Sequence, residues 1–151
     1  MIAMKSQIEI LYHEYHKNRN IQLNLEQFIY IASLFPSLLV CMSDGKLDKE
    51  EWEGVLAITD GLAQNYAADN ITVSEEELAR MFRIEFRYLL DNLDKWDKKF
   101  LNALKAHIDE NQSEKEFIYE TMYLLANAAD GISDTEQRTI DDLSRRLSLD
   151  H

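Results

Sequence analysis

Two short stretches of the chain combine an Asp-Gly step with further carboxylates and could therefore bind a cation. These acids are Asp44, Asp48 and Glu51 in the first stretch, with Asp130 and Glu136 in the second. Hard divalent cations prefer carboxylate oxygens, several of which must converge at about 2.3–2.6 Å. Two acidic turns that lie side by side would supply them.

Both stretches have the same order of residue types, which indicates an internal repeat. An apolar helix is followed by Asp-Gly, an apolar residue, a helix-capping residue and a Glu. The paired positions are Gly45 and Gly131, Leu47 and Ile132, Asp48 and Ser133, and Glu51 and Glu136. Glycine permits the left-handed backbone that ends a helix, and the cap starts the next one. Each stretch therefore predicts a helix–turn–helix hairpin, with the second loop one residue shorter.

The same residues also allow a purely structural interpretation. Asp-Gly at a helix end, and Asp or Ser followed by Glu at a helix start, satisfy turn geometry, capping and the helix dipole without any ligand. Both interpretations stay open at this point. An EF-hand is excluded, because its first and third ligand positions would fall on Val40 and Met42, which offer no side-chain oxygen.

The elements that must position these acids are helices. One Pro and four Gly in 151 residues suit an all-α fold of about seven helices. Five helix starts carry a cap with Glu or Gln three residues later: Asn24 with Gln27, Asp48 with Glu51, Ser74 with Glu77, Ser113 with Glu116, and Ser133 with Glu136. Two further helices are expected, one over 2–16 and one after Asp94 that buries Trp96, Phe100, Leu104 and Ile108.

The stretch 27–43 has no charged residue, yet it is too short and too often interrupted to span a membrane. It predicts a central buried helix, which we expect to kink or restart near Phe35 because Pro36 lacks a backbone donor. Cys41 lies in this stretch and is expected to be a core thiol. A single cysteine excludes an internal disulfide, and a reducing, cytoplasmic location is expected.

Charge is strongly acidic and unevenly distributed. The 16 basic and 28 acidic residues give a net charge of −12, which argues against nucleic acid as a partner. Residues 44–77 carry −8 and residues 109–136 carry −7, so the two turns dominate the charge. The length fits one domain over 1–151.

No residue pattern indicates an enzyme or an organic cofactor: nucleophilic triads, phosphate-cradling loops and dinucleotide fingerprints are absent from the sequence. His13 and His16 lie one helical turn apart but are expected to be exposed, and His107 is expected to be half-buried. Arg80, Arg83 and Arg87 are expected to pair within their own helix with Glu76, Glu77 and Glu85.

The second stretch, Ala129-Asp130-Gly131-Ile132-Ser133-Asp134-Thr135-Glu136, resembles the mark of the tellurite-resistance TerB-like family. The later Leu143-x-x-x-Leu147-Ser148-Leu149 is similar to the family's closing motif, with Ser148 where Gly is usual. The resemblance covers mainly residues 25–66 and 113–150. It implies an all-helical domain with repeat halves at about 24–66 and 113–150.

The resemblance also implies a non-catalytic role in stress or tellurite resistance, exercised through protein partners. A divalent cation, with calcium favoured, would be held by Asp44, Asp48, Glu51, Asp130 and Glu136. The alternative is a metal-independent acidic module that docks another protein. Oligomeric state is left open.

Overall fold

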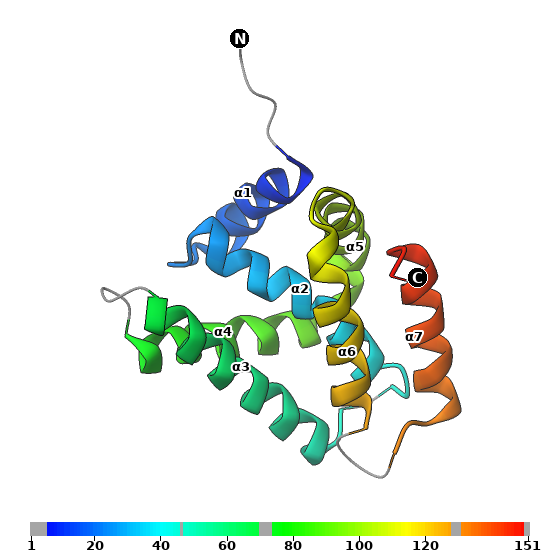
Figure 1. Cartoon of the computed structure of the whole chain (residues 1–151). Helices are drawn as coiled ribbons and strands as arrows, with labels where there is room; N and C mark the ends of the chain where they lie inside the picture. The colour runs from blue at the N-terminus through cyan, green and yellow to red at the C-terminus, as the bar shows by residue number, and fades with distance from the viewer. Residues whose placement is uncertain (1–5, 46, 70–73, 128–130, 150–151) are drawn as a thin grey trace.

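The computed structural model describes residues 6–45, 47–69, 74–127 and 131–149, and within them it contains seven α-helices, one short 3-10 helix and no strand. The helices are α1 (Gln7–Arg19), α2 (Leu25–Cys41), α3 (Lys49–Asp69), α4 (Glu75–Asp91), α5 (Leu93–Glu110), α6 (Lys115–Ala126) and α7 (Asp134–Arg146) (Figure 1). The all-α prediction of about seven helices is confirmed.

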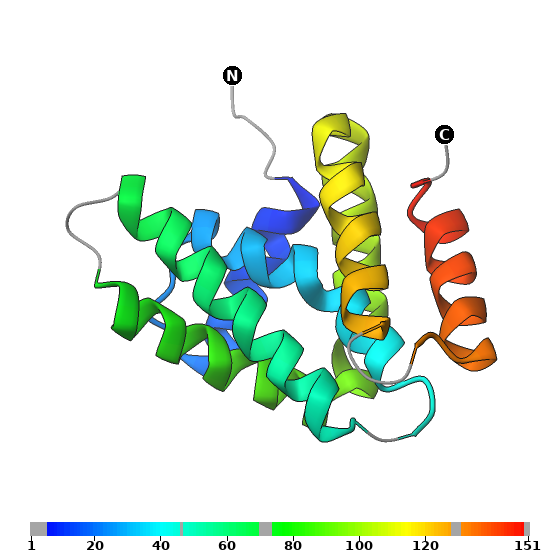
Figure 2. The same ribbon diagram turned by 60° about the horizontal axis from the view of Figure 1, so that its bottom comes forward.

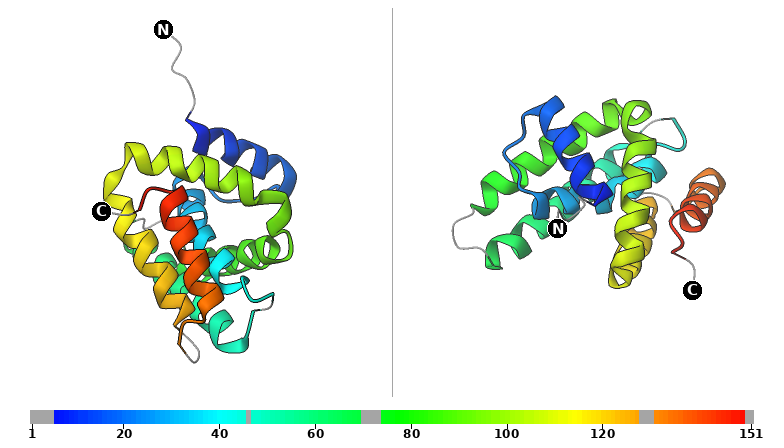
Figure 3. Two further views of the ribbon diagram at one scale, coloured as in Figure 1. Left: turned by 90° about the vertical axis from the view of Figure 1, so that its right-hand side faces the viewer. Right: turned by 90° about the horizontal axis from the view of Figure 1, so that it is seen from above.

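Helix α2 is the centre of the fold. It contacts α1, α4, α5, α6 and α7, and every residue from Ile31 to Leu38 is buried. Figure 3 shows α7 lying across one side of α2, with α6 beside it. The predicted central helix is therefore confirmed. No helix in the described part of the chain is long and apolar enough to cross a membrane.

The restart expected near Phe35 is wrong. Pro36 lies inside α2, which continues unbroken to Cys41. Proline removes one backbone hydrogen bond, but Phe35 and Leu38 beside it are at most 1% exposed. Burial of these large side chains offsets the lost bond and keeps the segment helical.

The aromatic part of the core joins α1, α2 and α5. The rings of Phe35 and Phe100 stack with centroids 4.6 Å apart, and Tyr15 and Trp96 pack with centroids 5.0 Å apart. The predicted α5 stripe of Trp96, Phe100, Leu104 and Ile108 is fully buried. Helices α1 and α5 consequently lie against each other (Figure 3).

Four of the five predicted caps are confirmed, and the cap at Ser113 is wrong. Ser113 lies within the 3-10 helix Gln112–Glu114, and α6 begins after it with Glu114 as a cap that makes no side-chain hydrogen bond. Backbone bonding replaces the side-chain cap, because the N–H of Glu114 donates to the carbonyl of Asn111. The first helix begins at Gln7 with Ser6 as its cap, and residues 1–5 lie outside the described part.

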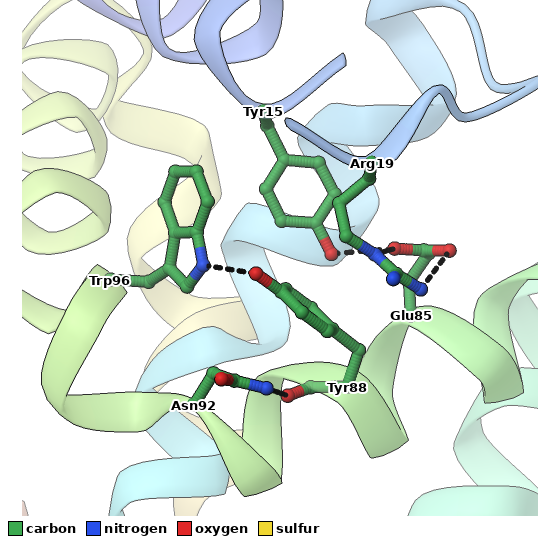
Figure 4. Close-up of polar contacts among 6 residues, drawn as sticks. All are labelled: Tyr15, Arg19, Glu85, Tyr88, Asn92 and Trp96. Atoms are coloured by element: carbon green, nitrogen blue, oxygen red, sulfur yellow. Dashed lines mark hydrogen bonds and ion pairs between the residues drawn. The ribbon is translucent and has the colours of Figure 1, made fainter. Parts of the chain in front are cut away.

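A buried polar cluster joins α1 to α4. The carboxylate of Glu85, which is 6% exposed, accepts a 2.7 Å hydrogen bond from the Tyr15 hydroxyl and two bonds from Arg19, at 3.0 and 3.2 Å (Figure 4). Burial, and then the charge of Glu85, raise the pKa of the Tyr15 hydroxyl, so Tyr15 stays a proton donor. Next to this cluster, the indole N–H of Trp96 donates to the Tyr88 hydroxyl.

Pairing of Glu85 with arginines of its own helix is therefore a wrong prediction. Glu85 faces the core and meets an arginine 66 residues earlier in the chain. Of the α4 arginines, only Arg80 bonds one of the predicted partners, Glu77, at 3.4 Å. Arg83 pairs with Asp60 of α3, and Arg87 pairs with Asp91 of its own helix.

Candidate carboxylate site between the two turns

The two acidic turns lie at the same end of the molecule (Figure 2). Residues from both stretches line one pocket. The pocket has a volume of about 290 Å³, and its lining residues are Asp44, Asp48, Glu51, Ala126, Gly131, Ile132, Ser133 and Glu136. Four of the five acids proposed as ligands are thus brought together. The fifth, Asp130, lies outside the described residues.

The glycines form the turns as predicted. Gly45 and Gly131 have φ angles of +90° and +96°, which side chains with a Cβ rarely adopt. The apolar residues after them, Leu47 and Ile132, are partly buried against the core and fix each turn to the molecule. An apolar residue next to each glycine therefore packs the turn against the core.

Each turn ends in a reciprocal capping arrangement that uses one oxygen of a glutamate. In the first, the N–H of Glu51 donates to Oδ1 of Asp48 at 2.8 Å, and the N–H of Asp48 donates to Oε1 of Glu51 at 3.5 Å. In the second, the N–H of Glu136 donates to Oγ of Ser133 at 3.0 Å, and the N–H of Ser133 donates to Oε1 of Glu136 at 2.9 Å. The equivalence of Glu51 and Glu136 by cap position is therefore visible in their bonding.

The second oxygen of Glu51 is not explained by capping. Glu51 is 6% exposed and Glu136 is 5% exposed, and Oε2 of Glu51 is buried without a hydrogen-bond donor. Burial, and next the neighbouring Glu136 carboxylate, raise the pKa of Glu51 to about 8. A buried carboxyl pair of this kind is stabilised by a shared proton or by a cation, since two unscreened negative charges repel.

Cys41 lies beneath the glutamate pair. Its side chain is 1% exposed, and burial together with the charge of Glu51 raises the pKa of its thiol. The thiol therefore stays protonated and is a poor nucleophile. The prediction of a core thiol is confirmed.

The donor set suits a hard divalent cation, because every ionisable side chain that lines the pocket is a carboxylate. Among the residues that the structure describes, no three His, Cys, Asp or Glu side chains are already close enough to hold a metal. Coordination by Asp44, Asp48, Glu51 and Glu136 therefore requires their oxygens to converge further.

The three histidines that the structure describes are not among the residues that line this pocket. His13 and His16 are exposed on α1, as predicted. His107 is partly buried, as predicted, with its side chain 11% exposed and Nε2 3.7 Å from the Glu114 carboxylate.

Comparison with known protein families, curated proteins and solved structures gave no match. The TerB-like resemblance therefore stays a prediction from the two turn motifs. What the site can do has to be argued from its own geometry.

Proposed function

We propose that this chain is a non-catalytic, TerB-like protein of stress or tellurite resistance that binds a divalent cation, preferably calcium, between its two acidic turns. The observation that carries the proposal is the Glu51 side chain, which lines the shared pocket and whose buried Oε2 has no hydrogen-bond donor. Capping accounts for the other oxygen of this side chain, so Oε2 is the atom left for a ligand.

Charge supports a cation in preference to other ligands. Asp44, Asp48, Glu51 and Glu136 line the pocket, and no lysine or arginine is among the lining residues. Like charges in a partly desolvated space raise one another's energy, and a divalent cation offsets several of them at once. An anion or a nucleic-acid phosphate would meet only repulsion there.

Binding at this place would join two hairpins that are far apart in the sequence. Asp48 and Glu51 belong to the start of α3, and Glu136 belongs to the first turn of α7. A cation held by both would fix α7 relative to α3 and so change the surface offered to a protein partner. The proposed role is therefore ion-dependent binding of a partner, without catalysis.

Thermal unfolding of chelator-treated protein tests the proposal, with calcium, magnesium, manganese and zinc added separately at constant ionic strength. A ligand specific for the folded state stabilises by about 2.7 kcal/mol at a hundredfold excess over its Kd, so we expect calcium to raise the Tm by several degrees. Glu51→Gln and Glu136→Gln should each abolish that rise.

Glu77→Gln is the matched control. Glu77 occupies the same third position of a capped helix but is exposed and lies outside the pocket, so its response to calcium should equal that of the wild type. Equal responses in all four proteins, or no cation-specific rise in the wild type, would overturn the proposal.

One observation favours the metal-independent alternative, an acidic module in which a proton joins Glu51 to Glu136. No three candidate ligands in the described residues already converge. The same titration separates the two functions, because a shared proton predicts no cation-specific stabilisation.

A further inference from the structure

Two exposed apolar side chains lie on one face of α6. Within the described residues, four large apolar side chains are substantially exposed: Ile10 at 56%, Ile84 at 44%, Phe117 at 40% and Leu124 at 63%. Phe117 and Leu124 are seven residues apart, so they lie on the same face about 10 Å from each other along the helix. In Figure 1, α6 lies between α3 and α7.

This face is not needed for the core. The opposite side of α6 supplies the buried residues Ile118, Met122, Leu125 and Ala126, which pack the helix against α2. Phe117 and Leu124 are therefore additional to the apolar stripe that a packed helix requires. Paired apolar residues on an exposed helix face are typical of a site for another helix.

The surroundings of the face are acidic. Glu120 lies between Phe117 and Leu124 along the helix axis but to one side of them, and Glu116 lies one turn before Glu120 on that same side; both are exposed. On the α7 side, Nε2 of Gln137 donates to the Tyr123 hydroxyl at 2.8 Å and to Asp141 at 3.0 Å, so α6 and α7 are joined beyond these glutamates.

We propose that this α6 face docks a basic amphipathic helix of a partner protein. The partner's apolar side would cover Phe117 and Leu124, and its lysines or arginines would meet Glu116 and Glu120. A second copy of this chain fits less well, because it would set the same acidic face against itself in a protein of net charge −12. The inference concerns a surface outside the turn site, and it does not depend on the cation.

Two synthetic peptides of identical Leu and Lys content, each of about 18 residues, test the proposal. One places Leu at i, i+3, i+4 and i+7, and the other has the same residues scrambled. Binding is measured by calorimetry in chelator, so that it is independent of the turn site. We expect the patterned peptide to bind the wild type, and Phe117→Ala and Leu124→Ala to weaken binding about tenfold each.

Ile10→Ala and Ile84→Ala are matched controls, since each also truncates an exposed apolar side chain, and they should bind as the wild type does. Glu120→Gln should weaken binding and reduce its salt dependence. Absence of binding, equal binding of the scrambled peptide, or unchanged affinity in Phe117→Ala and Leu124→Ala would each overturn the proposal. Self-association in sedimentation that Leu124→Ala abolishes would identify a second copy as the occupant and would also overturn it.

The two proposals fail separately. Loss of the calcium response in Glu51→Gln with unchanged peptide affinity would leave the α6 inference standing. Loss of peptide affinity in Leu124→Ala with a normal calcium response would leave the turn site standing.

Discussion

The Ser133 hydroxyl lies 3.2 Å from Oδ2 of Asp44, to which it donates a hydrogen bond across 89 residues of sequence. The same oxygen of Ser133 accepts from the N–H of Glu136 and so caps α7. One hydroxyl thus serves both the local start of a helix and the contact between two distant turns. Replacing Ser133 should therefore lower the free energy of unfolding by more than replacing an ordinary helix cap does.

Ser133→Ala should lower the free energy of unfolding by about 1.5–2.5 kcal/mol, since it removes both a cap and a hydrogen bond to a charged group. Chemical denaturation measures the change. Ser74→Ala is the control, because Ser74 caps α4 with a longer bond of 3.4 Å, and it should lower the free energy of unfolding by about 0.5–1 kcal/mol. Equal losses in the two variants would show that the contact to Asp44 contributes nothing.

Stability should fall as pH rises through the range in which Glu51 loses its proton. The ordinary pKa of about 4.5 is raised to about 8 in the folded protein, so the folded state holds the proton more tightly than the unfolded state does. The stabilisation is complete below pH 4.5 and is lost as pH rises to about 8, with a slope of at most about 1.4 kcal/mol per pH unit. Urea unfolding in chelator at several pH values measures it.

Glu51→Gln isolates this contribution from the titration of other acids. Glutamine stays neutral and can donate to Glu136, so the variant should lose the decline in stability between pH 5 and pH 8. A wild type and variant that change in parallel over this range would contradict the assignment of the slope to Glu51.

Removal of the buried Glu85 carboxylate on α4 should lower the free energy of unfolding far more than removal of the exposed Glu77 carboxylate on the same helix. Glu85→Ala leaves Arg19 and Tyr15 without their acceptor and should cost about 2–4 kcal/mol, while Tyr15→Phe should cost about 1–2 kcal/mol. Glu77→Ala breaks an exposed pair with Arg80 and should cost less than about 0.5 kcal/mol. Thermal denaturation would refute this ordering if Glu85→Ala and Glu77→Ala unfolded at the same temperature.

Alanine at three glycines should change stability in opposite directions. None of the Cβ atoms would meet another atom within 4 Å, so only backbone conformation differs. Gly45→Ala and Gly131→Ala force alanine into a left-handed backbone and should cost about 1 kcal/mol each. Gly61→Ala within α3 should instead stabilise by about 0.5–1 kcal/mol. A loss of stability in Gly61→Ala would contradict the explanation.

The turns and most helix starts could be predicted because their chemistry is local. Asp48 with Glu51 and Ser133 with Glu136 bond their own backbone within three residues, so the sequence carries the whole arrangement. Alignment of the caps also anticipated that Glu51 and Glu136 would be equivalent. Their meeting in one pocket depends on how α2, α3 and α7 pack against one another. The repeat in the sequence suggested this packing but did not determine it.

The wrong predictions concern Glu85, Ser113 and Pro36. Their causes are a long-range partner, a competing local turn and tertiary burial. Glu85 has suitable arginines on its own helix, and nothing in the spacing indicates that Arg19 would reach it from α1. Ser113 has the residue types of a cap, yet a backbone-bonded 3-10 turn takes its place. The unbroken helix through Pro36 reflects tertiary burial, which local propensity does not contain.

Helix α2 also determines how far the two sequence halves can act separately. It belongs to the first half but supplies the main packing surface for α6 and also contacts α7 in the second. The α6–α7 hairpin cannot bury its apolar side without α2, so a fragment that holds only α6 and α7 should not fold. Amide protons in the middle of α2 should exchange with deuterium only when the entire chain opens. The repeat seen in the sequence is therefore not a repeat of independent folding units, and the two acidic turns should be lost together.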